Sequence, residues 1–124
     1  MFFGPFGIEK AVMTTIHGYT ATQRLVDGPS EKDVRRGRAA AVNIVPSSTG
    51  AAKAVIQAVP ELEGKFDAVA IRVPVITGSL SVTSSVLSRD TNPEEINEVF
   101  ENASHSPRWE KILKVTEDPI VSTD

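Results

Sequence analysis

Two segments of the chain repeat apolar residues every three to four positions, which predicts amphipathic helices. The first segment covers residues 51–59 and ends before Pro60, and its apolar side is formed by Ala51, Ala52, Val55, Ile56 and Val59. The second segment starts with Asn92 and Pro93, a capping residue followed by a first-turn proline, and two acids follow at the positive end of the helix dipole. We therefore predict helices over residues 51–59 and from Pro93 to about Ala103. Ser47 or Ser48 is the predicted cap of the first helix.

Other segments carry the patterns of strands and loops. Residues 11–19 are rich in Val, Thr, Ile and Tyr, residues 66–73 form an apolar run before Pro74, and residues 80–87 alternate apolar residues with Ser and Thr. The last of these predicts a strand with one solvated face. Residues 24–38 form a polar loop, and so long a loop usually serves function or an interface.

The end of the chain holds two further predicted features. Trp109, Ile112 and Leu113 are expected to pack, and Ile120 and Val121 are expected to form a short last strand. The resulting order is strand, loop, helix, strand, strand, helix, strand. This order predicts a layered α/β or α+β domain.

Length and charge narrow the class of protein. The 124 residues suit a single domain. The net charge of −3 argues against general nucleic-acid binding. Residues 1–72 carry nine basic and seven acidic groups, whereas residues 73–124 carry four and nine, so an anion site is expected in the first part. No cysteine is present, which removes disulfides, thiolate metal sites and a cysteine nucleophile from these residues.

Targeting signals are not expected. No apolar run has the length of a membrane span. The apolar start at Met1 to Phe3 is broken by Gly4 and Pro5, and no basic stretch precedes it, so a signal peptide is not expected either. The default prediction is an intracellular, cytoplasmic protein that does not act at a membrane.

Two segments could carry chemistry in the first half of the chain. His17 lies on the first predicted strand and can act as a general base or be structural, because its ordinary pKa lies near neutrality. His105 lies near a helix end and looks like a surface residue, so no metal site is expected from two distant histidines without cysteine. Thr49 and Gly50 precede a helix, where free amides either bind an anion or are simply capped.

Arginines supply the remaining candidates. Arg35, Arg36 and Arg38 form a basic cluster within the long loop, which is usually a solvated face. Arg72 differs because it interrupts an apolar strand, and a buried guanidinium needs a carboxylate or phosphate partner. A serine triad built from Ser47 or Ser48 with His17 lacks the nucleophile-elbow signature.

Taken together, the sequence resembles the catalytic domain of glyceraldehyde-3-phosphate dehydrogenases. The resemblance runs from about Phe6 to the last residue and is loose between Val75 and Asn92. The matching strings are MTTIHGYTATQ at 13–23, DGPS at 27–30, GRAAAVNIVPSSTGAAKAV at 37–55, VPEL at 59–62, RVP at 72–74, TED at 116–118 and VSTD at 121–124. The family implies an α+β fold in which a mixed, largely antiparallel sheet has helices packed on one face. Residues 1–124 are then one partial catalytic domain without a dinucleotide-binding domain.

The resemblance also assigns expected roles to the candidate residues. His17 is expected to activate the catalytic cysteine and to accept the proton in hydride transfer. Thr20 and Arg72 are expected to bind the C3 phosphate of the substrate. Thr49 and Gly50 are expected to bind inorganic phosphate, with Arg36 as a nearby basic member.

Further expectations concern assembly and cofactor. Residues from Tyr19 to about Arg38 resemble the family's S-loop, which lines subunit contacts and approaches a neighbouring cofactor in the tetramer. The expected partners are therefore phosphate or a sugar phosphate and further copies of the chain. The full-length family uses NAD or NADP, and this chain alone is expected to bind neither.

The family's catalytic cysteine motif lies upstream of the histidine, and the chain begins too late to contain it. Three hypotheses follow. The chain is a segment of a phosphorylating dehydrogenase of glycolysis, inactive in isolation, or a non-enzymatic module that oligomerises and at most binds oxyanions. A third possibility is a related enzyme acting on a longer sugar phosphate, such as erythrose 4-phosphate.

Overall fold

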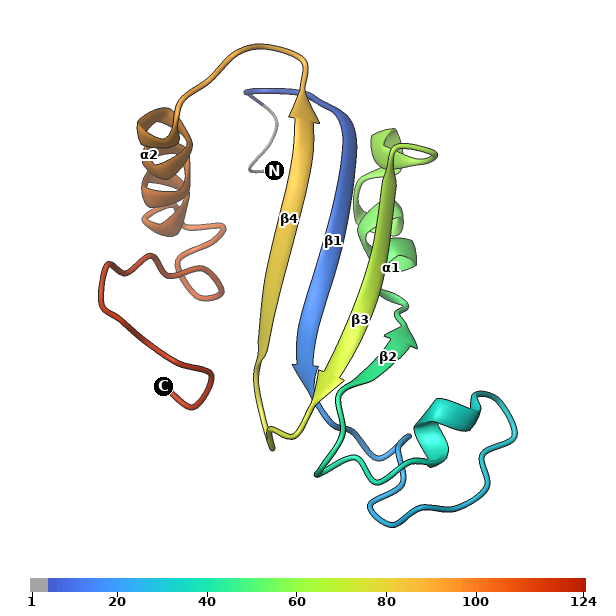
Figure 1. Cartoon of the computed structure of the whole chain (residues 1–124). Helices are drawn as coiled ribbons and strands as arrows, with labels where there is room; N and C mark the ends of the chain where they lie inside the picture. The colour runs from blue at the N-terminus through green and yellow to red at the C-terminus, as the bar shows by residue number, and fades with distance from the viewer. Residues whose placement is uncertain (1–4) are drawn as a thin grey trace.

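The computed structural model describes residues 5–124, which contain one four-stranded sheet (Figure 1). Its strands are β1 (Ile8–Gly18), β2 (Val45–Ser48), β3 (Phe66–Val73) and β4 (Ser79–Leu87), in the spatial order β2-β3-β1-β4. β1 runs parallel to β3, while β4 pairs antiparallel with β1 and β2 antiparallel with β3. The expected mixed, largely antiparallel sheet is therefore confirmed.

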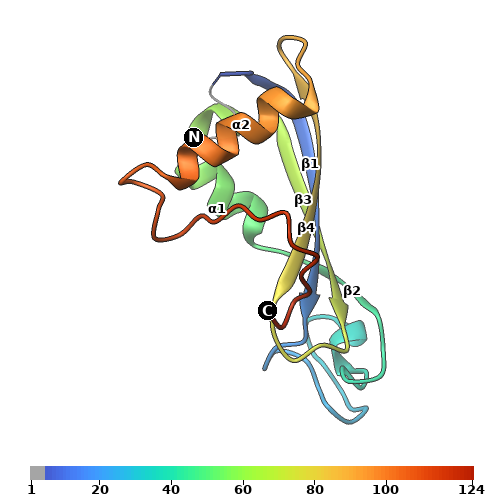
Figure 2. The same cartoon turned by 90° about the vertical axis from the view of Figure 1, so that its left-hand side faces the viewer.

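Two α-helices lie on the same side of this sheet, as the side view shows (Figure 2). They are α1 (Ala51–Ala58) and α2 (Pro93–Ser104). Two short 3-10 helices are also present: η1 (Val34–Gly37) precedes β2, and η2 (Pro60–Leu62) follows α1. The side chain of Asn92 caps α2 by accepting a hydrogen bond from the backbone N–H of Glu95 at 2.8 Å. Both predicted helices and the α+β class are confirmed.

Two local predictions are wrong, and one strand was not predicted. Ser47 and Ser48 do not cap α1, because both lie in strand β2; Gly50 occupies the cap position without a side-chain bond. The apolar pattern did not predict β2, since this four-residue edge strand includes Pro46 and two serines, and edge strands tolerate proline. Ile120 and Val121 form no strand and are 60% and 67% exposed.

The predicted packing segment near the end of the chain is confirmed only in part. Trp109 and Leu113 are half-buried, whereas Ile112 is 75% exposed. The aromatic residue and the leucine therefore pack, and the isoleucine does not.

The two faces of the sheet differ in burial. Ala11 and Ala70, which belong to the same face by strand register, are buried on the helix side. Their neighbours along the strands point the other way, and that open face is apolar and exposed, with Val12, Val69, Leu80, Val82 and Val86 all more than half exposed. The serine and threonine side of β4, predicted to be its solvated face, is exposed, and so is its apolar side.

No helix among residues 5–124 is long and apolar enough to cross a membrane.

Candidate site at the end of the sheet

His17 and Arg72 meet where the parallel strands β1 and β3 end. They are direct partners in the strand register, so the ladder itself places their side chains together. The Nη1 atom of Arg72 lies 2.7 Å from His17 Nδ1 and donates a hydrogen bond to the Gly18 carbonyl at 3.1 Å. A guanidinium only donates, so Nδ1 accepts from Arg72 in the tautomer in which Nδ1 carries no proton. In the other tautomer Nδ1 carries the proton and donates to the Gly18 carbonyl oxygen, which lies 2.6 Å away.

The other ring nitrogen of His17, Nε2, makes no hydrogen bond to any residue in the part of the chain that the structure describes. The imidazole is thus held through one nitrogen, while the second stays available for a proton or a ligand. This is the arrangement that an acid–base histidine requires.

Arg72 has lost part of its hydration without gaining a carboxylate. Burial lowers the pKa of its guanidinium, and the positive charge of Arg36 lowers that pKa further. Within residues 5–124, no carboxylate forms an ion pair with Arg72. The described residues thus supply no carboxylate partner for this arginine, and the phosphate stays a prediction.

Arg36 approaches the same region from η1. Its Nη2 atom donates to Ser47 Oγ at 2.8 Å and lies 3.4 Å from the Ser48 carbonyl oxygen. Its neighbours in the basic cluster behave differently, since Arg35 pairs with Asp33 at 3.0 Å and Arg38 pairs with Asp27 at 3.2 Å. Arg36 forms no ion pair among the described residues, although hydrogen bonds from Arg35 and then the charge of Arg36 lower the pKa of Asp33. Its charge also acts on Arg72, so the two arginines repel each other at this end of the sheet.

Thr49 and Gly50 follow β2 and begin α1. The hydroxyl of Thr49 accepts from the backbone N–H of Ala51 at 3.1 Å. Gly50 faces open space, with no atom within 4 Å of where a Cβ would lie. Because β2 runs antiparallel to β3, with Val45 opposite Arg72, the pair lies beyond the far end of β2. It does not contact His17 or Arg72.

Thr20 lies two residues after β1. Its hydroxyl contacts that of Thr22 at 3.1 Å, and its backbone N–H donates to Gln23 Oε1 at 3.4 Å. The structure thus brings His17 and Arg72 into contact and Arg36 into electrostatic reach, while Thr20 and the Thr49–Gly50 pair lie on adjoining segments.

Comparison with known proteins identifies the family. The family model described as "Glyceraldehyde 3-phosphate dehydrogenase, C-terminal domain" matches residues 3–124. The chain belongs to this family. It is 52% identical over 120 residues to a glyceraldehyde-3-phosphate dehydrogenase of Borreliella burgdorferi, with 96% of this chain and 36% of the relative covered.

Relatives from other lineages match equally well. A protein of the same name from Mycobacterium leprae is 52% identical over 119 residues, covering 96% of this chain and 34% of the relative. "Glyceraldehyde-3-phosphate dehydrogenase 1" of Candida glabrata is 50% identical over 119 residues, covering 96% and 36%. The chain therefore spans about a third of the length of these dehydrogenases.

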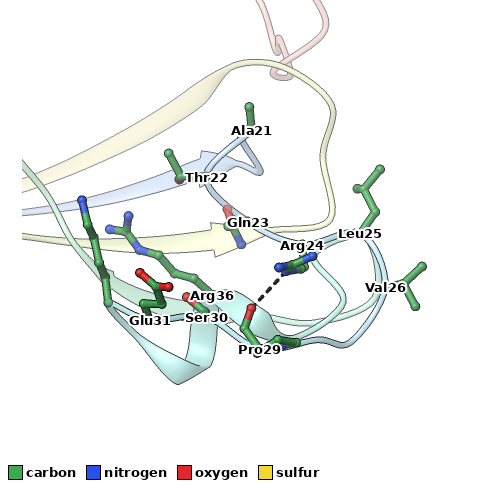
Figure 3. Close-up of a pocket in the computed structure, with 11 residues that line it drawn as sticks. Ala21, Thr22, Gln23, Arg24, Leu25, Val26, Pro29, Ser30, Glu31 and Arg36 are labelled. Carbon is green, nitrogen blue, oxygen red and sulfur yellow. Dashed lines mark hydrogen bonds between the residues drawn. The ribbon is translucent and has the colours of Figure 1, made fainter.

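In this member of the dehydrogenase family the long loop lines an open hollow of about 790 Å³ (Figure 3). Arg24 crosses it by donating to the Pro29 carbonyl at 3.0 Å. Gly28 N–H bonds to the Gly37 carbonyl at 2.8 Å, and a side chain at Gly37 would overlap the Gly28 carbonyl oxygen. The hollow includes Arg36 but neither His17 nor Arg72, so this hollow and the candidate chemistry are neighbours and not the same site.

Sequence reasoning did not assign two further residues to this region. Ser47, predicted with Ser48 as one of two possible helix caps, is buried and binds Arg36. Gln23 is buried beside Thr20, and its Nε2 has no partner among the described residues. Burial alternates along Val45–Ser48, but the sequence Val-Pro-Ser-Ser does not alternate apolar and polar residues, so no local signal placed Ser47 on a buried strand face. No group of three His, Cys, Asp or Glu residues within 5–124 could hold a metal ion.

Proposed function

We propose that these residues form the acid–base and phosphate-binding segment of a phosphorylating, NAD- or NADP-dependent glyceraldehyde-3-phosphate dehydrogenase. The observation that carries the proposal is that Arg72, which has no ion-pair partner among the described residues, lies within electrostatic reach of Arg36 and in contact with a histidine whose Nε2 is free. Phosphate groups bound beside them would neutralise the two arginines, and the one on Arg72 would replace the hydration that this guanidinium has lost.

The two phosphates of the reaction are assigned to different groups. Arg72 would bind the C3 phosphate of the aldehyde together with the hydroxyl of Thr20, because both lie at the end of β1 and β3. Inorganic phosphate would bind the amides and hydroxyl of Thr49 and Gly50, with Arg36 between the two groups. The start of α1 favours an anion there through its free N–H groups and dipole.

His17 would move the proton at Nε2 while Arg72 holds its Nδ1. The attacking thiolate must come from chain outside these 124 residues, since they contain no cysteine. When bound, the nicotinamide cofactor supplies the hydride acceptor. The described residues do not form its site alone, because α1 follows an antiparallel strand and no glycine-rich turn of the dinucleotide-binding type precedes it.

The alternative of a module that only binds oxyanions is not favoured, since the match to dehydrogenases covers nearly the whole chain. Glyceraldehyde 3-phosphate is the proposed aldehyde because the matched relatives carry that name, and erythrose 4-phosphate serves as the comparison substrate. A cytoplasmic location and the one-domain organisation of residues 1–124 stay predictions.

A chimera tests the proposal. The matching third of the Borreliella burgdorferi dehydrogenase is replaced by this chain, and NADH formation is followed with glyceraldehyde 3-phosphate and phosphate. We expect turnover in the chimera, none in the 124-residue chain alone, and a loss of about 10²- to 10⁴-fold in His17→Asn, as for removal of a general acid–base group. A folded chimera whose kcat is unchanged by His17→Asn would contradict the proposal.

Self-association is part of the same proposal. The open face of the sheet exposes Val12, Val69, Leu80, Val82 and Val86. Contiguous apolar surface of this kind favours association. We expect light scattering to show an oligomer at micromolar concentration and Val82→Lys to weaken it; a monomer at that concentration would contradict this part of the proposal.

A further inference from the structure

Ser47 is a buried polar residue that the proposed reaction does not use. It lies on β2 opposite Ala70 of β3, so the sheet ladder fixes its backbone, and its residue is only 7% exposed. Its hydroxyl accepts a hydrogen bond from Arg36 Nη2 at 2.8 Å and donates to the Ser48 carbonyl at 3.2 Å. Both capacities of the hydroxyl are therefore used within the segment.

Arg36 depends on this contact for its direction. The backbone of η1 is held by bonds from Arg36 N–H to the Asp33 carbonyl at 2.9 Å and from Arg24 N–H to the Arg36 carbonyl at 3.0 Å. The guanidinium itself has only Ser47 Oγ and the Ser48 carbonyl as hydrogen-bond partners among residues 5–124. A long side chain without such an anchor retains its rotamer freedom and loses it only when a ligand binds.

We propose that Ser47 is a positioning residue that aims the guanidinium of Arg36 at the inorganic phosphate assigned to Thr49 and Gly50. The inference rests on the proposed function of this site. Because Ser47 and the Ser48 carbonyl occupy Nη2, the N–H groups of Nη1 and Nε stay free for the anion. The hydrogen bond from Arg36 to Ser47 thus orders the arginine side chain before phosphate binds.

The test is a titration of the full 124-residue chain, labelled with ¹⁵N, with inorganic phosphate at constant ionic strength. Ser47→Ala is expected to weaken phosphate binding about fivefold to tenfold, as for loss of a hydrogen bond to a charged group. Ser47→Thr keeps the hydroxyl and is expected to stay within about twofold of the parent chain. Ser48→Ala is the matched control, because its hydroxyl makes no hydrogen bond among the described residues, and it is expected to leave binding unchanged.

A second readout follows the arginine directly. In the parent chain and in Ser47→Thr, the Nη2 protons of Arg36 should be resolved at low temperature because the hydrogen bond slows rotation of that group. In Ser47→Ala these signals should merge with those of Nη1. This measurement on the parent chain needs no variant, so it still decides the point if Ser47→Ala fails to fold.

The outcomes separate the two claims. Unchanged phosphate affinity in a folded Ser47→Ala, or merged Nη signals of Arg36 in the parent chain, would overturn the role of Ser47 alone. Resolved Nη2 signals in a parent chain that binds no phosphate would overturn the proposed phosphate site, while the Ser47–Arg36 contact would stand as a structural bond only. In the double variant with Arg36→Gln, Ser47→Ala should add no further loss of phosphate affinity.

Discussion

Arginines at two places in the molecule have opposite surroundings. At the junction of β4 and α2, Arg89 forms an ion pair with Glu95, donates to the Pro5 carbonyl at 3.0 Å and lies 4.7 Å from the centre of the Phe6 ring. At the end of β1 and β3, Arg72 meets a histidine, a carbonyl and the charge of Arg36. The charge of Arg89 is neutralised by an ion pair within the fold, whereas no carboxylate among the described residues forms an ion pair with Arg72. The charge of Arg72 is the feature on which the proposed site rests.

The largest expected effect separates these two arginines in the chimera. Arg72→Ala should reduce kcat/KM for glyceraldehyde 3-phosphate by about 10²-fold, because it removes charge-assisted bonds to the substrate phosphate. Arg89→Ala should change kcat/KM by less than about twofold, because Arg89 binds Glu95 and the Pro5 carbonyl and no group of the proposed site. Steady-state kinetics on both folded variants give the comparison.

Glyceraldehyde, which lacks the phosphate, is the control substrate. The decrease in kcat/KM for glyceraldehyde in Arg72→Ala measures the part of the effect that acts through His17. The additional decrease for the phosphorylated aldehyde measures phosphate binding. Equal decreases in kcat/KM for the two substrates would contradict a role of Arg72 in binding the substrate phosphate.

A second prediction compares two glycines of the same region. Gly37→Ala should lower the free energy of unfolding by about 1–3 kcal/mol, because the new methyl group overlaps the Gly28 carbonyl oxygen in the loop. Gly50→Ala should leave stability nearly unchanged, since the space around it is open and its φ of −81° suits any residue. Urea denaturation measures both, and equal stability losses would contradict the described packing of the loop.

The smallest expected effect is the pH dependence of the Arg89–Glu95 pair. Hydrogen bonds from Arg89 and then Thr91 lower the pKa of Glu95 from 4.5 to about 2. A lowered folded-state pKa stabilises the fold above the unfolded value, and that stabilisation is lost as pH falls from about 4.5 toward 2. The pair is exposed, so solvent keeps the effect small.

Thermal unfolding at several pH values checks this pair. Glu95→Gln should unfold at a lower temperature than the parent chain at pH 6, and the difference should shrink toward pH 2. A difference that stays constant over this range would show that the lost carboxylate charge is not its cause.

Periodic elements were predictable from sequence, and non-local ones were not. α2 follows from Asn92, Pro93 and the spacing of its apolar residues, all of which are local signals. β2 exists because β3 offers it a ladder, and four residues that include Pro46 carry too little pattern to show this. The strand at Ile120 failed for the converse reason, since apolar residues form a strand only where a partner strand is available.

The candidate site divides in the same way. Arg72 was predictable as a cation in an apolar strand that needs an anion, and the roles of His17, Thr20 and Arg36 came from the family resemblance. The contact between His17 and Arg72 was not predictable, because it depends on the register of β1 against β3. The contact between Ser47 and Arg36 was not predictable either, because it depends on η1 lying beside β2.

The central claim is that phosphate binds where the two arginines are unneutralised. The most direct measurement maps amide shifts of the labelled 124-residue chain during a phosphate titration. The account predicts shifts at His17, Thr20, Arg36 and Arg72 and at the Thr49–Gly50 pair, none at Arg89, and a dissociation constant in the millimolar range, or about 4 kcal/mol. Binding should weaken as chloride is added, since exposed charges are screened. No shift at Arg36 and Arg72 by tens of millimolar phosphate, on the order of ten times that constant, would contradict it.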